Sequence, residues 1–176
     1  LKMLKRGLLI LAFIAFIYVG FQMSGGMRAG QDALAGKKYD QAIALWEEIA
    51  ENGSPIPFFN PQTKAQQKIG HVHAFRDDEK DDIDEAIKWW KRAAKGGNEV
   101  AQFSLAQSYW EGNGLEQNFE HAYTWAMVSA DKKSKSQRRY LVNATTYKKS
   151  LTADQESSAT KAVKACLDSG FEDCPY

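Results

Sequence analysis

The sequence contains few of the residues from which catalytic and metal centres are built. Its 176 residues include three histidines and two cysteines, and it has no phosphate-binding loop, hydrolase elbow or zinc-protease motif. Positive and negative charges nearly cancel, at 23 Lys and Arg against 22 Asp and Glu, so the chain lacks the positive field of nucleic-acid-binding proteins. We therefore expect no enzymatic activity, no cofactor or metal, no small-molecule substrate and no nucleic acid.

Two short patterns have the composition of a metal site but not its geometry. His71 and His73 are two residues apart, and on a helix such residues point about 200° away from each other, so they cannot bind one ion. The acidic run at residues 77–82 has Asp where a calcium loop needs Gly, and Lys88 where it needs the closing Glu. We expect these acids to cap the positive end of a helix that begins near Ile83.

A pattern of alanine and tryptophan recurs after 36 residues, and a repeat of this length is typical of solenoids. Within each copy the small and aromatic residues fall on one stripe of an α-helix. The sequence therefore predicts an all-α fold, an α/α solenoid of helical hairpins. The positions that define the repeat are Ala65, Gly70, Ala86, Trp89 and Ala94 in one copy and Ala101, Leu105, Tyr109, Ala122, Trp125 and Ala130 in the next, with Gly112 and Gly114 in the turn between the helices.

A third copy precedes these two. Residues 39–53 match residues 83–97 at an offset of 44, so eight extra residues enter the connection. Proline is scarce in this chain, and three of its four prolines lie at residues 54–61, where they exclude a helix interior. In this loop Phe58 and Phe59 are candidate partner-binding residues, which either fill the groove between the first two repeats or project toward a partner.

Residues 101–130 closely resemble a Sel1-like repeat, a relative of the tetratricopeptide repeat. Residues 65–94 are similar but carry Arg76 and Asp78 where the glycine pair belongs, so we expect a differently built turn. The resemblance implies a non-enzymatic adaptor whose stacked helices form a concave partner-binding surface. Its candidate residues by helical position are Gln66, Gln102 and Trp110, together with Gln67, Phe103 and Gln107.

The N-terminal segment is the longest uncharged stretch of the chain. Residues 7–27 carry no charge, and 21 residues at about 1.5 Å each span about 31 Å, enough to cross a hydrocarbon core of about 30 Å. We expect residues 1–27 to be an uncleaved transmembrane anchor. Phe13, Phe16 and Phe21 form the bulky side of this helix, and Ala12, Ala15 and Gly20 form its close-packing side. Leu8 is a further residue of the predicted anchor.

The flanking charges and the cysteines indicate the compartment. Lys2, Lys5 and Arg6 precede the apolar run and only Arg28 follows it closely, which predicts a cytoplasmic N-terminus and, in a bacterial inner membrane, a periplasmic repeat domain. Cys166 and Cys174 are predicted to form a disulfide that folds the tail back, worth about 2–3 kcal/mol; two unpaired thiols are the alternative.

Five cations crowd the segment that follows the last repeat. These cations are Lys132, Lys133, Lys135, Arg138 and Arg139. We expect them to form a solvated face; contact with anionic headgroups or with an acidic subunit is the alternative. Two further helices follow, one over about residues 135–149 and one opened by a capping-box pattern at Thr152 and Gln155.

The predicted domain plan is an anchor at 1–27, repeats at 28–134 (28–53, 65–97 and 101–133) and capping helices with the disulfide tail at 135–176. This plan predicts a single-pass accessory or scaffold subunit of an integral-membrane protein complex, which acts through protein–protein interaction on the periplasmic side. The alternative is a freestanding periplasmic or secreted protein that binds or hydrolyses a cell-wall-type substrate.

Overall fold

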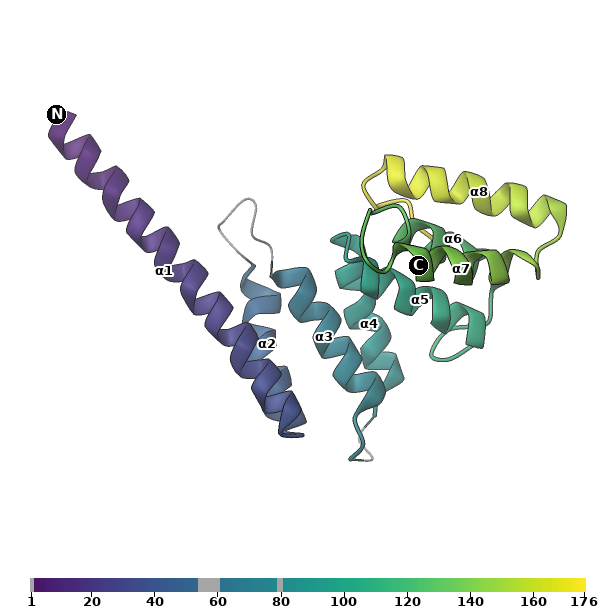
Figure 1. The fold of residues 1–176 in the computed structure, drawn as a ribbon, viewed down its shortest axis with the longest axis horizontal. Coiled ribbons are helices and arrows are strands. Elements are labelled where there is room, and N and C mark those ends of the chain that lie inside the picture. Colours follow the sequence, from purple (N-terminus) through teal and green to yellow (C-terminus); the bar gives the residue numbers. More distant parts are fainter. Residues whose placement is uncertain (1, 54–60, 79–80) are drawn as a thin grey trace. The chain divides into compact units, whose positions relative to one another are not determined.

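The computed structural model describes the backbone of residues 2–53, 61–78 and 81–176, and the side chains in these ranges from Ile14 onward except Phe16, Val19 and Phe21. This described part is all-helical (Figure 1), as the sequence predicted. The helices are α1 (Lys2–Ala35), α2 (Tyr39–Asn52), α3 (Gln62–Phe75), α4 (Ile83–Lys95), α5 (Glu99–Glu111), α6 (Phe119–Ser129), α7 (Gln137–Lys148) and α8 (Ala153–Asp168). The chain divides into two compact units, residues 1–69 and 70–176, which are described separately.

In the first unit, the C-terminal part of α1 packs against α2 as a helical hairpin. Two glycines of α1 allow the close approach: a Cβ on Gly30 would lie 2.3 Å from Nε1 of Trp46, and one on Gly26 would lie 3.1 Å from Ile49. The Trp46 side chain is fully buried, and its Nε1 donates a hydrogen bond to the Met27 carbonyl at 3.3 Å. The end of α1 is therefore the first helix of the first repeat.

α1 is much longer than its partner. Its 34 residues rise about 51 Å, whereas the 14 residues of α2 rise about 21 Å. The N-terminal half of α1 therefore extends beyond α2 (Figure 1), and the predicted boundary after residue 27 falls inside a continuous helix.

The expected transmembrane anchor, residues 1–27, coincides with the N-terminal part of α1. Within the described residues, no helix combines the length and the apolar character needed to cross a membrane. Of the predicted anchor residues, Ala15 is exposed and Gly20 is half-buried. The side chains of the others lie outside the described ones: Leu8, Ala12, Phe13, Phe16 and Phe21.

In the second unit, α5 packs against α4 and α6, and α6 packs against α7 and α8. Alanines at the contacts let these helix backbones approach, while tryptophans fill the remaining space. Gly70 shows the limit of this close packing, because a Cβ there would lie 2.6 Å from Cδ1 of Trp90. The repeat-defining side chains in the core are Ala86, Trp89, Ala94, Ala101, Leu105, Tyr109, Ala122, Trp125 and Ala130; Ala65, in the first unit, is also fully buried.

The two repeat turns are built from different residues. After α5, Gly112 adopts the left-handed conformation at φ 69°, and Gly114 has φ 72° and lies against Ile83, where a Cβ would be 2.7 Å from Cγ1. After α3, the buried guanidinium of Arg76 instead binds Asp78 through two hydrogen bonds of 2.6 Å. The turn after α3 thus replaces glycine flexibility with a bidentate ion pair.

Side-chain caps fix the helix starts that the sequence indicated. Asp82 accepts a hydrogen bond from the Glu85 amide at 2.9 Å, which confirms the capping role expected of the acidic run. Thr152 and Gln155 form both hydrogen bonds of a capping box at the start of α8. Phe58 and Phe59 lie outside the described residues.

Candidate functional site

A groove of about 440 Å³ follows one face of α5 in the second unit. On α5 it is lined by residues spaced three or four apart, the spacing of one helical face. These are Val100, Phe103, Ser104, Gln107, Ser108 and Glu111. The rest of the lining comes from His71, Ala74 and Phe75 of α3, Ile83 and Trp90 of α4, Asn113, and Arg139 and Asn143 of α7.

An exposed aromatic side chain occupies one side of this groove. Phe75 is 67% exposed, although its ring lies 4.7 Å from that of His71 and 6.4 Å from that of Trp90. In the next repeat the equivalent position, 36 residues on, is Glu111, which is also exposed. The repeat architecture therefore does not require an aromatic residue at this position.

A guanidinium lies on the α7 side of the groove. Cζ of Arg139 is 5.6 Å from the ring centre of Phe103 and 5.3 Å from that of Tyr140, so two aromatic rings hold the side chain in place. In the described part of the chain, no carboxylate forms an ion pair with Arg139. Its N–H donors therefore remain available to a ligand.

Two amide side chains also line the groove, Gln107 on α5 and Asn143 on α7. Asn143 donates from Nδ2 to the Arg139 carbonyl at 2.9 Å, which leaves its side-chain oxygen as an acceptor. Gln107 is exposed on the groove face of α5. Ser104 donates to the Val100 carbonyl of its own helix at 3.1 Å, so its hydroxyl is engaged with backbone rather than with a base. The groove thus offers hydrogen bonds, a cation and apolar area for binding.

The structure places two of the predicted partner-binding residues inside the repeats. Gln66 is 6% exposed and donates to the Ala50 carbonyl at 3.2 Å; Gln102 is 1% exposed and donates to the Ala94 carbonyl, also at 3.2 Å. Each amide therefore ties the first helix of a repeat to the end of the preceding helix, and this burial corrects their assignment to a partner surface. The prediction used the helical position of these glutamines alone. Helical position does not define which residues the next helix covers, because that depends on the curvature of the superhelix.

Trp110 has a packing role as well. It is half-buried, stacks on Tyr147 with ring centres 4.5 Å apart, and lies 5.0 Å from Phe119. It therefore fastens α7 to α5. Phe103 and Gln107, predicted as residues of a concave surface, line the groove, and so does Phe75, which the sequence pattern did not indicate.

The first unit has a smaller groove of its own, about 370 Å³, between α1 and α2. Tyr18, which is 62% exposed and accepts a hydrogen bond from Gln22 at 2.8 Å, lies at this groove. The lining residues are Tyr18, Gln22, Met23, Gly26, Leu45, Glu48, Ile49 and Asn52.

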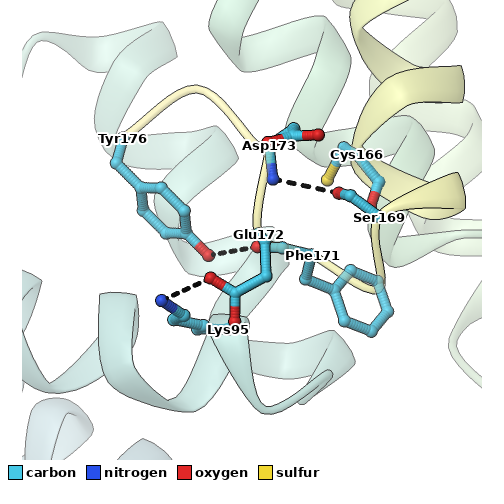
Figure 2. Close-up of polar contacts among 7 residues, drawn as sticks. All are labelled: Lys95, Cys166, Ser169, Phe171, Glu172, Asp173 and Tyr176. Carbon is cyan, nitrogen blue, oxygen red and sulfur yellow. Dashed lines mark hydrogen bonds and ion pairs between the residues drawn. The ribbon is translucent and has the colours of Figure 1, made fainter.

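The C-terminal tail is held on the second unit by a set of contacts that we call the clasp, formed by residues 166–176 (Figure 2). Cys166 and Cys174 form a disulfide, as predicted. Glu172 pairs with Lys95 of α4 at 2.6 Å, and Trp125 of α6 donates from Nε1 to the Pro175 carbonyl at 2.7 Å. The clasp therefore attaches the tail to the second helices of two repeats.

Aromatic side chains complete the clasp. Tyr176 lies edge-on to Trp125, with ring centres 5.3 Å apart, and donates from its hydroxyl to the Phe171 carbonyl at 3.0 Å. Burial, and then the charge of Glu172, raises the pKa of Tyr176 to about 12, so its hydroxyl stays protonated at neutral pH. Phe171 lies against Gly97, where a Cβ would be 2.8 Å from Cε2.

The described residues contain no candidate metal centre. Among them, no group of three or more His, Cys, Asp or Glu side chains is placed to hold a metal ion. His121 packs edge-on to Tyr109 with ring centres 4.9 Å apart, and burial lowers its pKa despite the opposing charge of Glu120. This contact is aromatic packing in the repeat core.

Comparisons with known proteins agree with the repeat architecture. The Sel1 repeat model matches residues 27–54, 63–98 and 100–132, which is more than half of the chain. The chain is similar to the chitin synthase regulator SKT5 of Saccharomyces cerevisiae, at 32% identity over 113 residues, which cover 64% of this chain and 14% of that protein.

A solved structure has a similar fold. It is a protective antigen present in uropathogenic Escherichia coli strains and displays an SLR fold; the TM-score is 0.70 at 20% identity, over 85% of this chain and 31% of the other. Sel1 repeat proteins are generally non-enzymatic adaptors that mediate protein–protein interactions. On its sequence matches and its helical hairpins, the chain belongs to the Sel1 repeat family.

Proposed function

We propose that this protein is a membrane-anchored, non-enzymatic scaffold that binds an extended segment of a partner protein along α5. The observation that carries the proposal is the groove on α5, which is lined by an exposed phenylalanine, by amide side chains and by a guanidinium that no described carboxylate pairs with. Such a mixture of apolar anchors and hydrogen-bonding groups suits a peptide backbone with a few recognised side chains. A relative described as a regulator of an enzyme is consistent with a binding role.

The length of α1 supports the anchor. Residues 2–17, which precede the segment of α1 that packs on α2, rise about 24 Å, so with the residues that follow them the helix is long enough to cross a hydrocarbon core of about 30 Å. In the described portion of this extension Ile14 and Ile17 are each 56% exposed. Large apolar side chains on a helix without a protein neighbour favour lipid or a partner helix around it.

Charge asymmetry supports the orientation. Lys2, Lys5 and Arg6 before the apolar run keep the N-terminus in the cytoplasm, which places the repeats in the periplasm of a bacterium. The disulfide of the clasp suits that oxidising compartment. The accessory subunit thus carries its groove on the outer face of the membrane, where other subunits of an integral-membrane complex present extended segments.

Photo-crosslinking tests the groove. A photoreactive amino acid replaces Gln107, which is exposed on α5, or, as a control, Lys161, which is exposed on α8. After illumination in native membranes we expect one discrete adduct from position 107 and none of the same mass from position 161. Equal adducts from both positions, or none from position 107 in membranes that contain the complex, would contradict binding along α5.

Gentle detergent extraction followed by native mass spectrometry tests the complex. The full chain is expected to co-purify in fixed stoichiometry with integral-membrane subunits. Removal of residues 1–17 leaves the α1 segment that packs on α2, so the repeats should still fold while membrane association is lost. A truncated chain that remains in the membrane after carbonate washing would refute the anchor.

A further inference from the structure

We propose that the segment bound along α5 combines an acidic side chain, which pairs with Arg139, and an aromatic or large apolar side chain, which packs on Phe75. This inference rests on the proposed function, because it names the chemistry of the partner for the same groove. It follows from three features of the described residues: the environment of Arg139, the exposure of Phe75 and the polar side chains that line the groove with them.

The cationic side of the groove selects a carboxylate. The guanidinium of Arg139 lies beside the rings of Phe103 and Tyr140, which reduces its freedom and leaves its N–H edge for a planar, bidentate acceptor. Lys135 and Arg138 lie close in sequence and are also exposed, so with Arg139 these cations outnumber Glu111, the carboxylate that lines the same groove. No described carboxylate pairs with Arg139.

The opposite side of the groove selects apolar surface. Phe75 is exposed to 67%, and beside it Trp90 is 97% buried and also lines the groove. A side chain placed on Phe75 would cover an aromatic face that water now covers, and such contacts are the usual anchors of binding. The equivalent position of the next repeat is Glu111, which offers no aromatic face. The apolar anchor is therefore confined to the α3 side of the groove.

The polar side chains along the groove suit an extended backbone. Gln107 of α5 and Asn143 of α7 are amides, and the equivalent position of α3, 36 residues before Gln107, is His71. Two helix diameters of about 10 Å separate the outer two helices, and an extended chain rises about 3.3 Å per residue. We therefore expect the acidic and apolar side chains of the ligand to lie about six residues apart.

Fluorescence anisotropy with designed peptides tests the inference on the full chain in detergent. The probe is a capped, labelled peptide with two Asp residues and one Phe residue about six positions away, in a background of Ser, Thr and Gln; both sequence orders are made. Control peptides replace Asp by Lys or Phe by Ser. We expect the Asp and Phe peptide to bind at least about tenfold more tightly than either control.

Protein variants assign the preference to the two residues. R139E should reverse the preference between the Asp and Lys peptides, and F75S should weaken the parent peptide about tenfold while leaving the Phe-to-Ser peptide unchanged. K161E on α8 matches the charge change of R139E away from the groove and should preserve the preference. Neither Phe75 nor Arg139 is a core residue, so folding should be retained in circular dichroism.

Three outcomes would overturn the inference: equal binding of Asp and Lys peptides, equal effects of R139E and K161E, or unchanged binding by F75S. If the crosslink from position 107 still captures a partner in these cases, the groove binds protein with another chemistry and the proposed function stands. If that crosslink is absent as well, both fail.

Discussion

At the scale of single residues, glycines on the first helices of the repeats control how close two helices come. Gly30 faces the ring of Trp46, and Gly70 faces that of Trp90. Both tryptophans are buried, so neither ring has space to move away from an added methyl group. These two positions therefore require the absence of a side chain, while the left-handed turn positions require conformational freedom.

Gly30→Ala should destabilise the first repeat by about 2 kcal/mol, because the new Cβ would lie 2.3 Å from Trp46 Nε1 and force the two helices apart. Gly25→Ala is the matched control: it lies on the same helix with no atom within 4 Å, and should stabilise by about 0.5–1 kcal/mol through helix propensity. Urea unfolding of the full chain in detergent measures both. Equal effects would show that the Trp46 contact does not constrain α1.

His121 is expected to make stability depend on pH. Burial lowers its pKa in the folded protein below the usual 6.5, so on acidification the unfolded chain takes up a proton first and the free energy of unfolding falls as pH drops below about 6.5. His121→Phe keeps an aromatic edge on Tyr109 and should flatten this part of the profile. Melting temperatures of both proteins from neutral pH downward test this; parallel curves would exclude a contribution of His121.

At the scale of helices, the sequence predicted most of the repeat architecture because alanine and tryptophan recur at fixed spacing. It could not show that α1 continues from the apolar run into the first repeat. There the pattern is different, because Gly26 and Gly30, rather than alanine, face α2. The predicted end of the anchor at residue 27 therefore falls inside α1. Helix continuity depends on this pairing with α2, which only the structure displays.

The candidate site was harder to predict than the helices. Gln66 and Gln102 have the polarity of surface residues, yet each satisfies a backbone carbonyl at the end of the preceding repeat. Arg139 appeared only as one member of a cationic cluster, because its contact with Phe103 joins residues from different helices. Side-chain partners across helices are set by the stacking of the repeats, and a single repeat pattern does not encode them.

The contacts of the clasp are expected to raise the free energy of unfolding of the second unit. Its disulfide closes a loop of 8 residues and should contribute about 2.5 kcal/mol. Replacing both Cys166 and Cys174 by Ala should lower the melting temperature and change the fluorescence of Trp125, whose Nε1 bonds the Pro175 carbonyl. Dithiothreitol should do the same to the parent protein and leave the double variant unaffected. An unchanged melting temperature would mean that Glu172, Pro175 and Tyr176 hold the tail without the disulfide.

At the scale of the whole molecule, the anchor, the charge asymmetry and the disulfide make one joint prediction about topology. In the proposed orientation the charges before the apolar run retain the N-terminus in the cytoplasm, so the cysteines, which lie more than 130 residues beyond the run, would cross the membrane and meet an oxidising compartment. The same thiols in a chain that stays in the cytoplasm would remain reduced. The redox state of Cys166 and Cys174 therefore reports on which side of the membrane the repeats lie.

Thiol alkylation in bacterial cells tests that topology. The full chain should bind a thiol-reactive mass tag only after reduction, whereas a chain that lacks residues 1–17 should bind two tags without reduction. A third chain, with Lys2, Lys5 and Arg6 changed to Glu and four lysines inserted after Arg28, reverses the charge asymmetry and should also be labelled directly while it stays in the membrane. Direct labelling of the unaltered full chain would place the repeats in the cytoplasm. In that case the disulfide could not stabilise the clasp in the cell, and Lys95, Trp125 and their partners in the tail would have to hold it alone.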